Sequence, residues 1–256
     1  MARIYRFGDR AAVVEVAERP GPEATETIAR LFRVLSERPF PGMVEAVPAL
    51  TTLAVFYDPV AVAAALRGGV DAAPGVDAES TPVFIRVRAE LERAIGEAGR
   101  GGTVGAAEAD GPKEDEHVVV VPVCYGGEFG PDLAELAERS GMTPEEAAAL
   151  HSAAEYRVAM IGFLPGFPYL TGLPERLAAP RKETPRSRVP PGAVGIGGVY
   201  TGIYPVASPG GWRWIGRTPL SLFDPDRTPP FLLRVGDRVR FRPISEEEFR
   251  AAGESP

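Results

Sequence analysis

Residues 156–217 decide the fold of this chain, and they read YRVAMIGFLPGFPYLTGLPERLAAPRKETPRSRVPPGAVGIGGVYTGIYPVASPGGWRWIGR. Within this stretch, the segments GFLPGFPYL, PRSRVPPG and SPGGW are dense in glycine and proline. Glycine permits positive φ and close backbone approach, whereas proline fixes φ and removes a hydrogen-bond donor. This density of glycine and proline excludes long helices and predicts short strands joined by loops of defined shape. Loops of this kind commonly bind ligands.

The whole chain has the composition of an ordinary globular protein. Its 256 residues carry a net charge of −7 and one cysteine. The acidic balance argues against general nucleic-acid binding, and a single cysteine excludes an intrachain disulfide. The opening MARIYRFGDR lacks the apolar core of a signal peptide, and no run approaches the roughly eighteen apolar residues of a membrane span. We expect a cytoplasmic protein that binds neither nucleic acid nor membranes.

Residues 1–98 predict a small α/β domain. Two short strands surround the turn at Gly8 and Asp9, and a helix begins at Pro22. The apolar face of this helix comprises Ile28, Leu31, Phe32 and Leu35. Two more strands, the short helix PVAVAAALR and a helix over 81–98 follow. This order of elements indicates an α+β sandwich, for which we expect a ferredoxin-like topology.

Residues 99–116, GRGGTVGAAEADGPKEDE, predict a flexible linker. They are rich in glycine, alanine and acidic residues and cannot bury enough apolar surface to order themselves. The second domain then covers residues 117–256. It begins with the strand HVVVVPVCY and two helices, the second of which opens with a capping box of Thr143 and Glu146. It continues as many short strands, which predicts a closed or nearly closed β-barrel.

Two further elements are expected near the C-terminus. LLRVGDRVRFRPI, residues 232–244, predicts a hairpin with Gly236 and Asp237 in its turn. Ser245 and Glu248 have the spacing of a capping box at the start of a last short helix.

The chain has two histidines and one cysteine, and few common motifs of catalysis or metal binding can be built from them. No P-loop, G-x-S-x-G or zinc spacing is present, and with two histidines we expect no metal site. We expect His117 to be exposed and Cys124 to act as a small buried hydrophobe. His151, in the last turns of a helix, has two interpretations. It either places positive charge against the helix dipole or acts as a general acid or base facing the loops.

Three arginines lie beside proline or glycine turns: Arg181, Arg186 and Arg217. Each could donate two hydrogen bonds to the carboxylate or phosphate of a ligand, or could pair with an acidic residue on the protein surface. The SPGGW segment offers either an amide nest for an anion or a tight strand connection in which Trp212 fills the core.

The chain closely resembles one protein family in GDRAAVVEV, PVCYGGEFGPDL, LHSAAEYRVAMIGFLPGFPYLTGLP, PRSRVPPGAVGIGG and TGIYPVASPGGWRWIGRTP. This is the 5-oxoprolinase B-subunit family (PxpB/KipI), also named allophanate hydrolase subunit 1 or carboxyltransferase domain subdomain C/D, and it includes the kinase inhibitor KipI. The resemblance covers nearly the whole chain apart from residues 99–116. It implies an N-terminal α/β domain and a C-terminal cyclophilin-like β-barrel.

The resemblance also implies partners and a reaction. The C-subunit of 5-oxoprolinase, which is a related barrel, would join this chain together with the A-subunit, which has a different fold. The complex would carry out the ATP-dependent opening of 5-oxoproline to glutamate. We expect ATP, with Mg²⁺, at a site shared with a partner, and we expect the chain to be inactive alone. ATP would phosphorylate the amide carbonyl oxygen and make it a leaving group, which requires cations and amide donors around developing negative charge.

The family motifs map onto residues of this chain. We expect His151 to transfer protons and Arg186 and Arg217 to stabilise negative charge. The expected substrate-binding residues are Tyr156, Phe163, Phe167, Tyr169, Ser208, Gly210, Gly211 and Thr218. Aromatic residues at a barrel rim are also commonly structural.

Two other functions remain open from the sequence. One is a KipI-like inhibitor of a histidine kinase, which an exposed apolar patch on the second domain would favour. The other is a component of an allophanate hydrolase or urea carboxylase system acting on a different amide.

Overall fold

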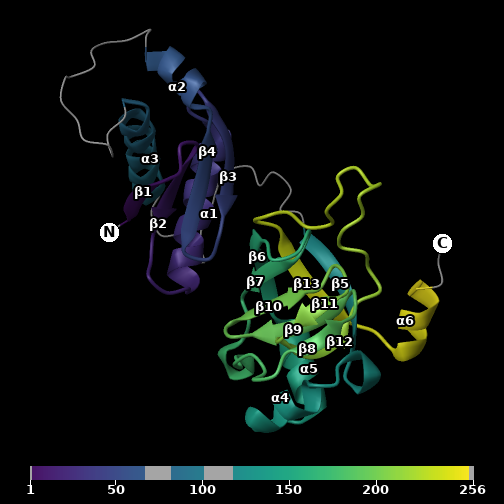
Figure 1. Cartoon of the computed structure of the whole chain (residues 1–256). Coiled ribbons are helices and arrows are strands. Elements are labelled where there is room, and N and C mark those ends of the chain that lie inside the picture. Colours follow the sequence, from purple (N-terminus) through teal and green to yellow (C-terminus); the bar gives the residue numbers. More distant parts are fainter. Residues whose placement is uncertain (1, 67–81, 101–117, 254–256) are drawn as a thin grey trace. The chain divides into compact units, whose positions relative to one another are not determined.

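The structure is a computed structural model that describes residues 2–66, 82–100 and 118–253. The chain divides into two compact units, Met1–Lys113 and Glu114–Pro256, each with its own hydrophobic core (Figure 1). Within the described ranges, every helix is too short or too polar to cross a bilayer.

The first unit is a four-stranded antiparallel sheet with helices. Its elements are β1 (Arg3–Phe7), β2 (Ala11–Glu15), α1 (Pro22–Glu37), β3 (Met43–Pro48), β4 (Thr52–Tyr57), α2 (Pro59–Leu66) and α3 (Pro82–Arg100). The predicted strands and helices are therefore confirmed. The predicted linker, residues 99–116, lies outside the described residues except for Gly99 and Arg100 at the end of α3, and His117 lies outside them too.

The ferredoxin-like topology is not confirmed. A ferredoxin-like unit places a helix between its first two strands. Here β1 and β2 form a direct hairpin through Gly8, whose φ is 67°, and the sheet order is β1-β2-β4-β3. Helices α1 and α3 contact this sheet and each other. Leu31 of α1 is buried in the same core as Val14 and Val55, as the period of the helix predicts.

The second unit is built on a closed barrel of seven strands, as the sequence predicts. Its elements are β5 (Val118–Tyr125), α4 (Leu133–Arg139), α5 (Pro144–Ala153), β6 (Glu155–Ile161), β7 (Pro168–Thr171), β8 (Arg186–Val189), β9 (Ala193–Gly197), β10 (Tyr200–Ile203), β11 (Ser208–Gly210), β12 (Arg213–Arg217), β13 (Arg238–Pro243) and α6 (Glu246–Gly253). The barrel order is β10-β7-β6-β13-β5-β12-β9, and β11 pairs with β8 in a separate ribbon. In Figure 1, α4 and α5 lie together at one end of this unit.

Both predicted capping boxes are present. Thr143 and Glu146 exchange side-chain to backbone bonds at the start of α5, and Ser245 and Glu248 do so at the start of α6. Cys124 is buried in β5, where burial raises the pKa of its thiol, as a small hydrophobic role requires.

The hairpin predicted over residues 232–244 is wrong. Only its second half is a strand, β13, which pairs in parallel with β5 and antiparallel with β6. The first half bonds elsewhere, because the Leu232 N–H donates to the carbonyl of Leu222 and the Gly236 N–H to that of Val158. Both edges of β13 are already occupied, so no hairpin partner can be accommodated.

Two glycines of the second unit leave room for aromatic rings. A Cβ at Gly197 would lie 2.6 Å from Cε2 of Trp212, and a Cβ at Gly210 would overlap the ring of Tyr204. Both rings are buried. The high glycine content of this unit is therefore a packing requirement as well as a turn signal.

Replacing Gly197 with alanine should destabilise the protein, because the buried Trp212 ring cannot move aside. We expect the free energy of unfolding to fall by about 1–3 kcal/mol, as for other overpacked cores. Urea unfolding of Gly197→Ala measures the loss. Gly211→Ala is the matched control, since its Cβ would meet Pro185 at an ordinary 3.6 Å. Equal stability of the two variants would contradict this account.

Candidate functional site

Four aromatic rings and one arginine converge at the ends of β7, β10 and β12, and we call this group the aromatic–arginine cluster. The Trp212 ring centroid lies 5.3 Å from that of Phe167 and 5.4 Å from that of Tyr169, both nearly perpendicular to it. Tyr204 lies 5.1 Å from Phe167. The guanidinium carbon of Arg181 lies 6.0 Å from the centre of Trp212, within cation–π range.

Phe163 extends this cluster toward solvent. Its ring lies 5.6 Å from that of Phe167, yet its side chain is 64% exposed. Its φ of 72° is in the left-handed region, which costs a bulky residue on the order of 1–3 kcal/mol. An exposed aromatic side chain on a strained loop marks a position that is suited to contact another molecule.

A buried carboxylate ties the elements around this cluster together. Asp132 accepts two bonds from the Arg186 guanidinium, at 2.6 and 2.8 Å, and one of 2.9 Å from Lys182 Nζ. It also accepts the backbone N–H of Trp214 at 2.8 Å. Although Asp132 precedes α4 as its N-cap, its side chain does not cap the helix. The predicted anion-binding Arg186 is therefore paired internally.

The electrostatics of Asp132 follow from these partners. Burial alone raises the pKa of this carboxyl, but the hydrogen bonds from Arg186, Lys182 and the Trp214 N–H outweigh burial, and the pKa lies below its ordinary value. The carboxylate is thus charged at neutral pH. Glu135 extends the network by accepting bonds from Lys182 at 3.1 Å and Arg213 at 2.5 Å.

His151 lies in the barrel core and is fully buried. Its Nε2 is 3.0 Å from the Thr201 hydroxyl, and its Nδ1 is 2.8 Å from the Tyr125 hydroxyl. Thr201 donates its proton to the carbonyl of Gly195, so Nε2 must donate to Thr201 and Nδ1 must accept from Tyr125. The ring also stacks on Phe241 at 4.6 Å. All of these contacts fit a neutral imidazole.

Burial lowers the pKa of His151 to about 3. The predicted charge–dipole interaction therefore does not apply at neutral pH, and the ring is enclosed with none of its surface exposed. Tyr156 is buried beside it and donates its hydroxyl to the carbonyl of His151 at 2.8 Å. The geometry supports a structural role for both residues.

Arg217 and Thr218 lie apart from the aromatic–arginine cluster, at the other end of β12. Arg217 donates to the carbonyl of Pro191 at 2.9 Å, and its guanidinium carbon lies 5.5 Å from the Phe249 ring. Thr218 is buried and accepts the N–H of Leu220 at 3.2 Å. The predicted catalytic residues His151, Arg186 and Arg217 thus do not meet in one place.

The SPGGW segment is a strand connection. Ser208 and Gly210 belong to β11 and pair with β8, while the Gly211 carbonyl accepts the N–H of Lys182 at 2.7 Å. Trp212 is buried, as the core-filling interpretation predicts.

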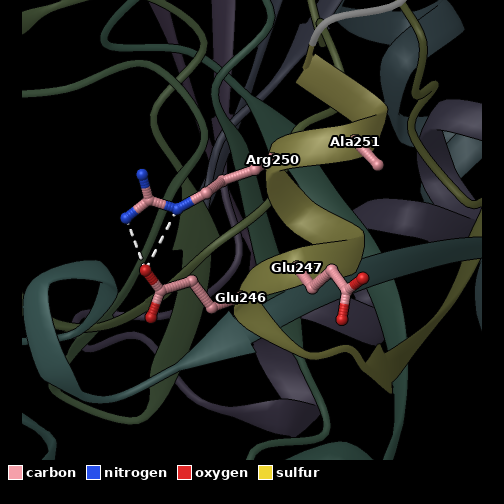
Figure 2. A pocket seen from close by; sticks show the side chains of 4 residues that line it. All are labelled: Glu246, Glu247, Arg250 and Ala251. Carbon is pink, nitrogen blue, oxygen red and sulfur yellow. Dashed lines mark hydrogen bonds and ion pairs between the residues drawn. The ribbon is translucent and has the colours of Figure 1, made fainter.

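A hollow on α6 is lined by Glu246, Glu247, Arg250 and Ala251 (Figure 2). All four residues lie on one exposed helix, and Figure 2 shows Arg250 paired with Glu246. The hollow lies on the surface of a single element, so the aromatic–arginine cluster remains the better candidate site.

Several residues that organise this region were missed in the sequence: Asp132, Glu135, Lys182, Arg213 and Tyr125. The partners of Asp132 lie 50, 54 and 82 positions away. Only the fold brings them together, and no local spacing signals the network.

Residues 2–233 match the family model described as "Carboxyltransferase domain, subdomain C and D". The chain is 41% identical to the 5-oxoprolinase B-subunit of Bacillus subtilis, over 97% of this chain and 95% of that protein. It is 40% identical to the 5-oxoprolinase B-subunit of Escherichia coli O157:H7, over 96% and 97%. A crystal structure of TTHA0988 superimposes with a TM-score of 0.68 at 36% identity, covering 93% of this chain and 40% of that one.

The buried His151 should make the protein sensitive to acid. Its folded-state pKa of about 3 lies below the ordinary 6.5, so between these values the unfolded chain binds the extra proton and stability falls as the pH is lowered. From pH 7.5 to pH 5 the His151 contribution to the loss is about 2 kcal/mol. Urea unfolding across this range measures it. His151→Asn should lose this part of the slope, and an unchanged slope would refute the assignment.

The Asp132 network should stabilise the second unit. The pKa of the Asp132 carboxyl is lower in the folded state than in the unfolded state. The stability that this carboxylate contributes is therefore present above the unfolded-state pKa and is lost as pH falls through the folded-state pKa. Asp132→Asn should cost about 1–3 kcal/mol at pH 7, since Arg186 and Lys182 lose their counter-charge but keep access to water. Thermal unfolding measures this. Glu138→Gln, on the exposed face of α4, is the control and should change little.

Proposed function

The chain belongs to the family of the carboxyltransferase domain, subdomain C and D, and on that basis we propose that it is the B-subunit of a 5-oxoprolinase complex. The observation that carries this proposal is the match along almost the whole length of two bacterial relatives of that name. The aromatic–arginine cluster of the closed barrel supports this proposal, because aromatic rings and a cation are suited to contact a small ring-shaped acid.

The reaction proposed for the complex is the hydrolysis of a cyclic amide. One water adds across the C–N bond of 5-oxoproline, the bond breaks, and a carboxylate and a free amine result. The coupled hydrolysis of ATP to ADP and phosphate consumes a second water and supplies the free energy. The complex must hold the substrate carboxylate and exclude competing water from the reacting carbonyl.

The described residues do not fit Mg²⁺-bound ATP by themselves. Magnesium prefers carboxylate oxygens and retains several waters. The acidic residues near the aromatic–arginine cluster, Asp132 and Glu135, are already paired with cationic side chains. Within the described ranges, no three His, Cys, Asp or Glu side chains are placed to hold a metal ion. We propose that the assembled complex, rather than this chain alone, binds the nucleotide.

The proposed partners are the A- and C-subunits of 5-oxoprolinase, and the chain is expected to be inactive without them. The kinase-inhibitor function and the urea-system function remain alternative predictions. Both would leave the assembled mixture without activity on 5-oxoproline.

Glutamate release from 5-oxoproline and ATP tests the proposal. We expect glutamate from the mixture of this chain with the A- and C-subunits, and none from this chain alone or from the two partners without it. A mixture of three folded chains that releases no glutamate would overturn the proposed function. Release by this chain alone would overturn the shared-site expectation.

A further inference from the structure

The loop that carries Arg181 is fixed on both sides. The Pro180 carbonyl accepts a bond of 3.1 Å from Arg213. On the other side, the Lys182 side chain binds Asp132 and its backbone N–H donates to Gly211. Because Pro180 and Lys182 are both held by hydrogen bonds, the backbone of Arg181 between them has little conformational freedom. Arg181 is thus held in position before any ligand arrives.

Arg181 differs from the other cations of this region in its partners. Arg186, Arg213 and Lys182 all pair with the carboxylates of Asp132 or Glu135. Within the described residues, Arg181 makes no hydrogen bond or ion pair, and its guanidinium lies against the face of Trp212. The side chain is exposed, so its planar fork of N–H donors is available to an anion.

Tyr169 provides a second available group next to Arg181. Its ring lies 5.4 Å from Trp212 and is partly buried, and its hydroxyl has no hydrogen-bond partner among the described side chains and backbone. Arg181 and Tyr169 both lie against the Trp212 ring, at 6.0 and 5.4 Å from its centre. Burial raises the pKa of this phenol, and Arg181 lowers it. The protonated hydroxyl can donate to the same anion that Arg181 binds.

We propose that Arg181 and Tyr169, supported by Trp212, bind the carboxylate of a small cyclic substrate. The planar guanidinium of Arg181 and the neutral hydroxyl of Tyr169 can both donate to a carboxylate, and the Trp212 ring beside them can pack against the compact ring that carries it. The identity of the ligand, 5-oxoproline, rests on the proposed function. The site itself rests on the pinned loop and on two polar groups that the fold leaves without partners among the described residues.

Calorimetric binding of 5-oxoproline to the full chain, alone and in the assembled complex, tests the site. Arg181→Gln should weaken binding about 10-fold to 100-fold, the range of a lost charge-assisted pair. Binding of 5-oxoprolinamide, in which a neutral amide replaces the carboxylate, should change much less. Tyr169→Phe keeps the ring but removes the hydroxyl, and it should weaken the binding of 5-oxoproline about tenfold. Arg188→Gln is the matched control, an exposed arginine on β8 that should bind as wild type.

The outcomes separate the site from the function. The site is overturned if wild type binds no 5-oxoproline in either state, if Arg181→Gln binds like wild type, or if this variant loses the acid and the amide equally. Binding that follows the prediction without glutamate release by the wild-type complex would retain the site and overturn the proposed function. If the complex releases glutamate and Arg181→Gln leaves KM for 5-oxoproline unchanged, the proposed function is retained and the site is overturned.

Discussion

The aromatic–arginine cluster depends on the absence of side chains opposite its rings. Gly197 faces Trp212, and Gly202 faces Phe167 at distances that no Cβ could share. The rings can therefore pack directly against the backbone of β9 and β10 and edge to face against each other, which fixes the plane of the Trp212 ring. Arg181 lies over that plane, so its position is a consequence of the glycines on β9 and β10.

The second unit uses its cations for two different purposes. A buried carboxylate needs several donors to offset desolvation, and Asp132 obtains them from Arg186, Lys182 and a backbone N–H. This pairing fixes Lys182, the residue directly after Arg181. It also occupies the charges of Lys182 and Arg186, whereas Arg181 keeps its donors available. Structural and binding arginines are thus distinguished by their partners.

Local features of this fold could be predicted from the sequence, because they depend on neighbouring residues. The capping box at Thr143 and the buried face around Leu31 are examples. Nonlocal features could not. The hairpin at Gly236 failed because its first half bonds to Leu222 and Val158. The role of His151 was open because only the barrel places Tyr125 and Thr201 on its two ring nitrogens.

A structure of the assembled complex with 5-oxoproline tests the central claim most directly. The account predicts that the substrate carboxylate lies within hydrogen-bond distance, about 3 Å, of both the Arg181 guanidinium and the Tyr169 hydroxyl. It also predicts that Arg186 remains bound to Asp132 and that His151 stays enclosed. A carboxylate bound at Arg217, or on residues of a partner chain with Arg181 left in solvent, would contradict it.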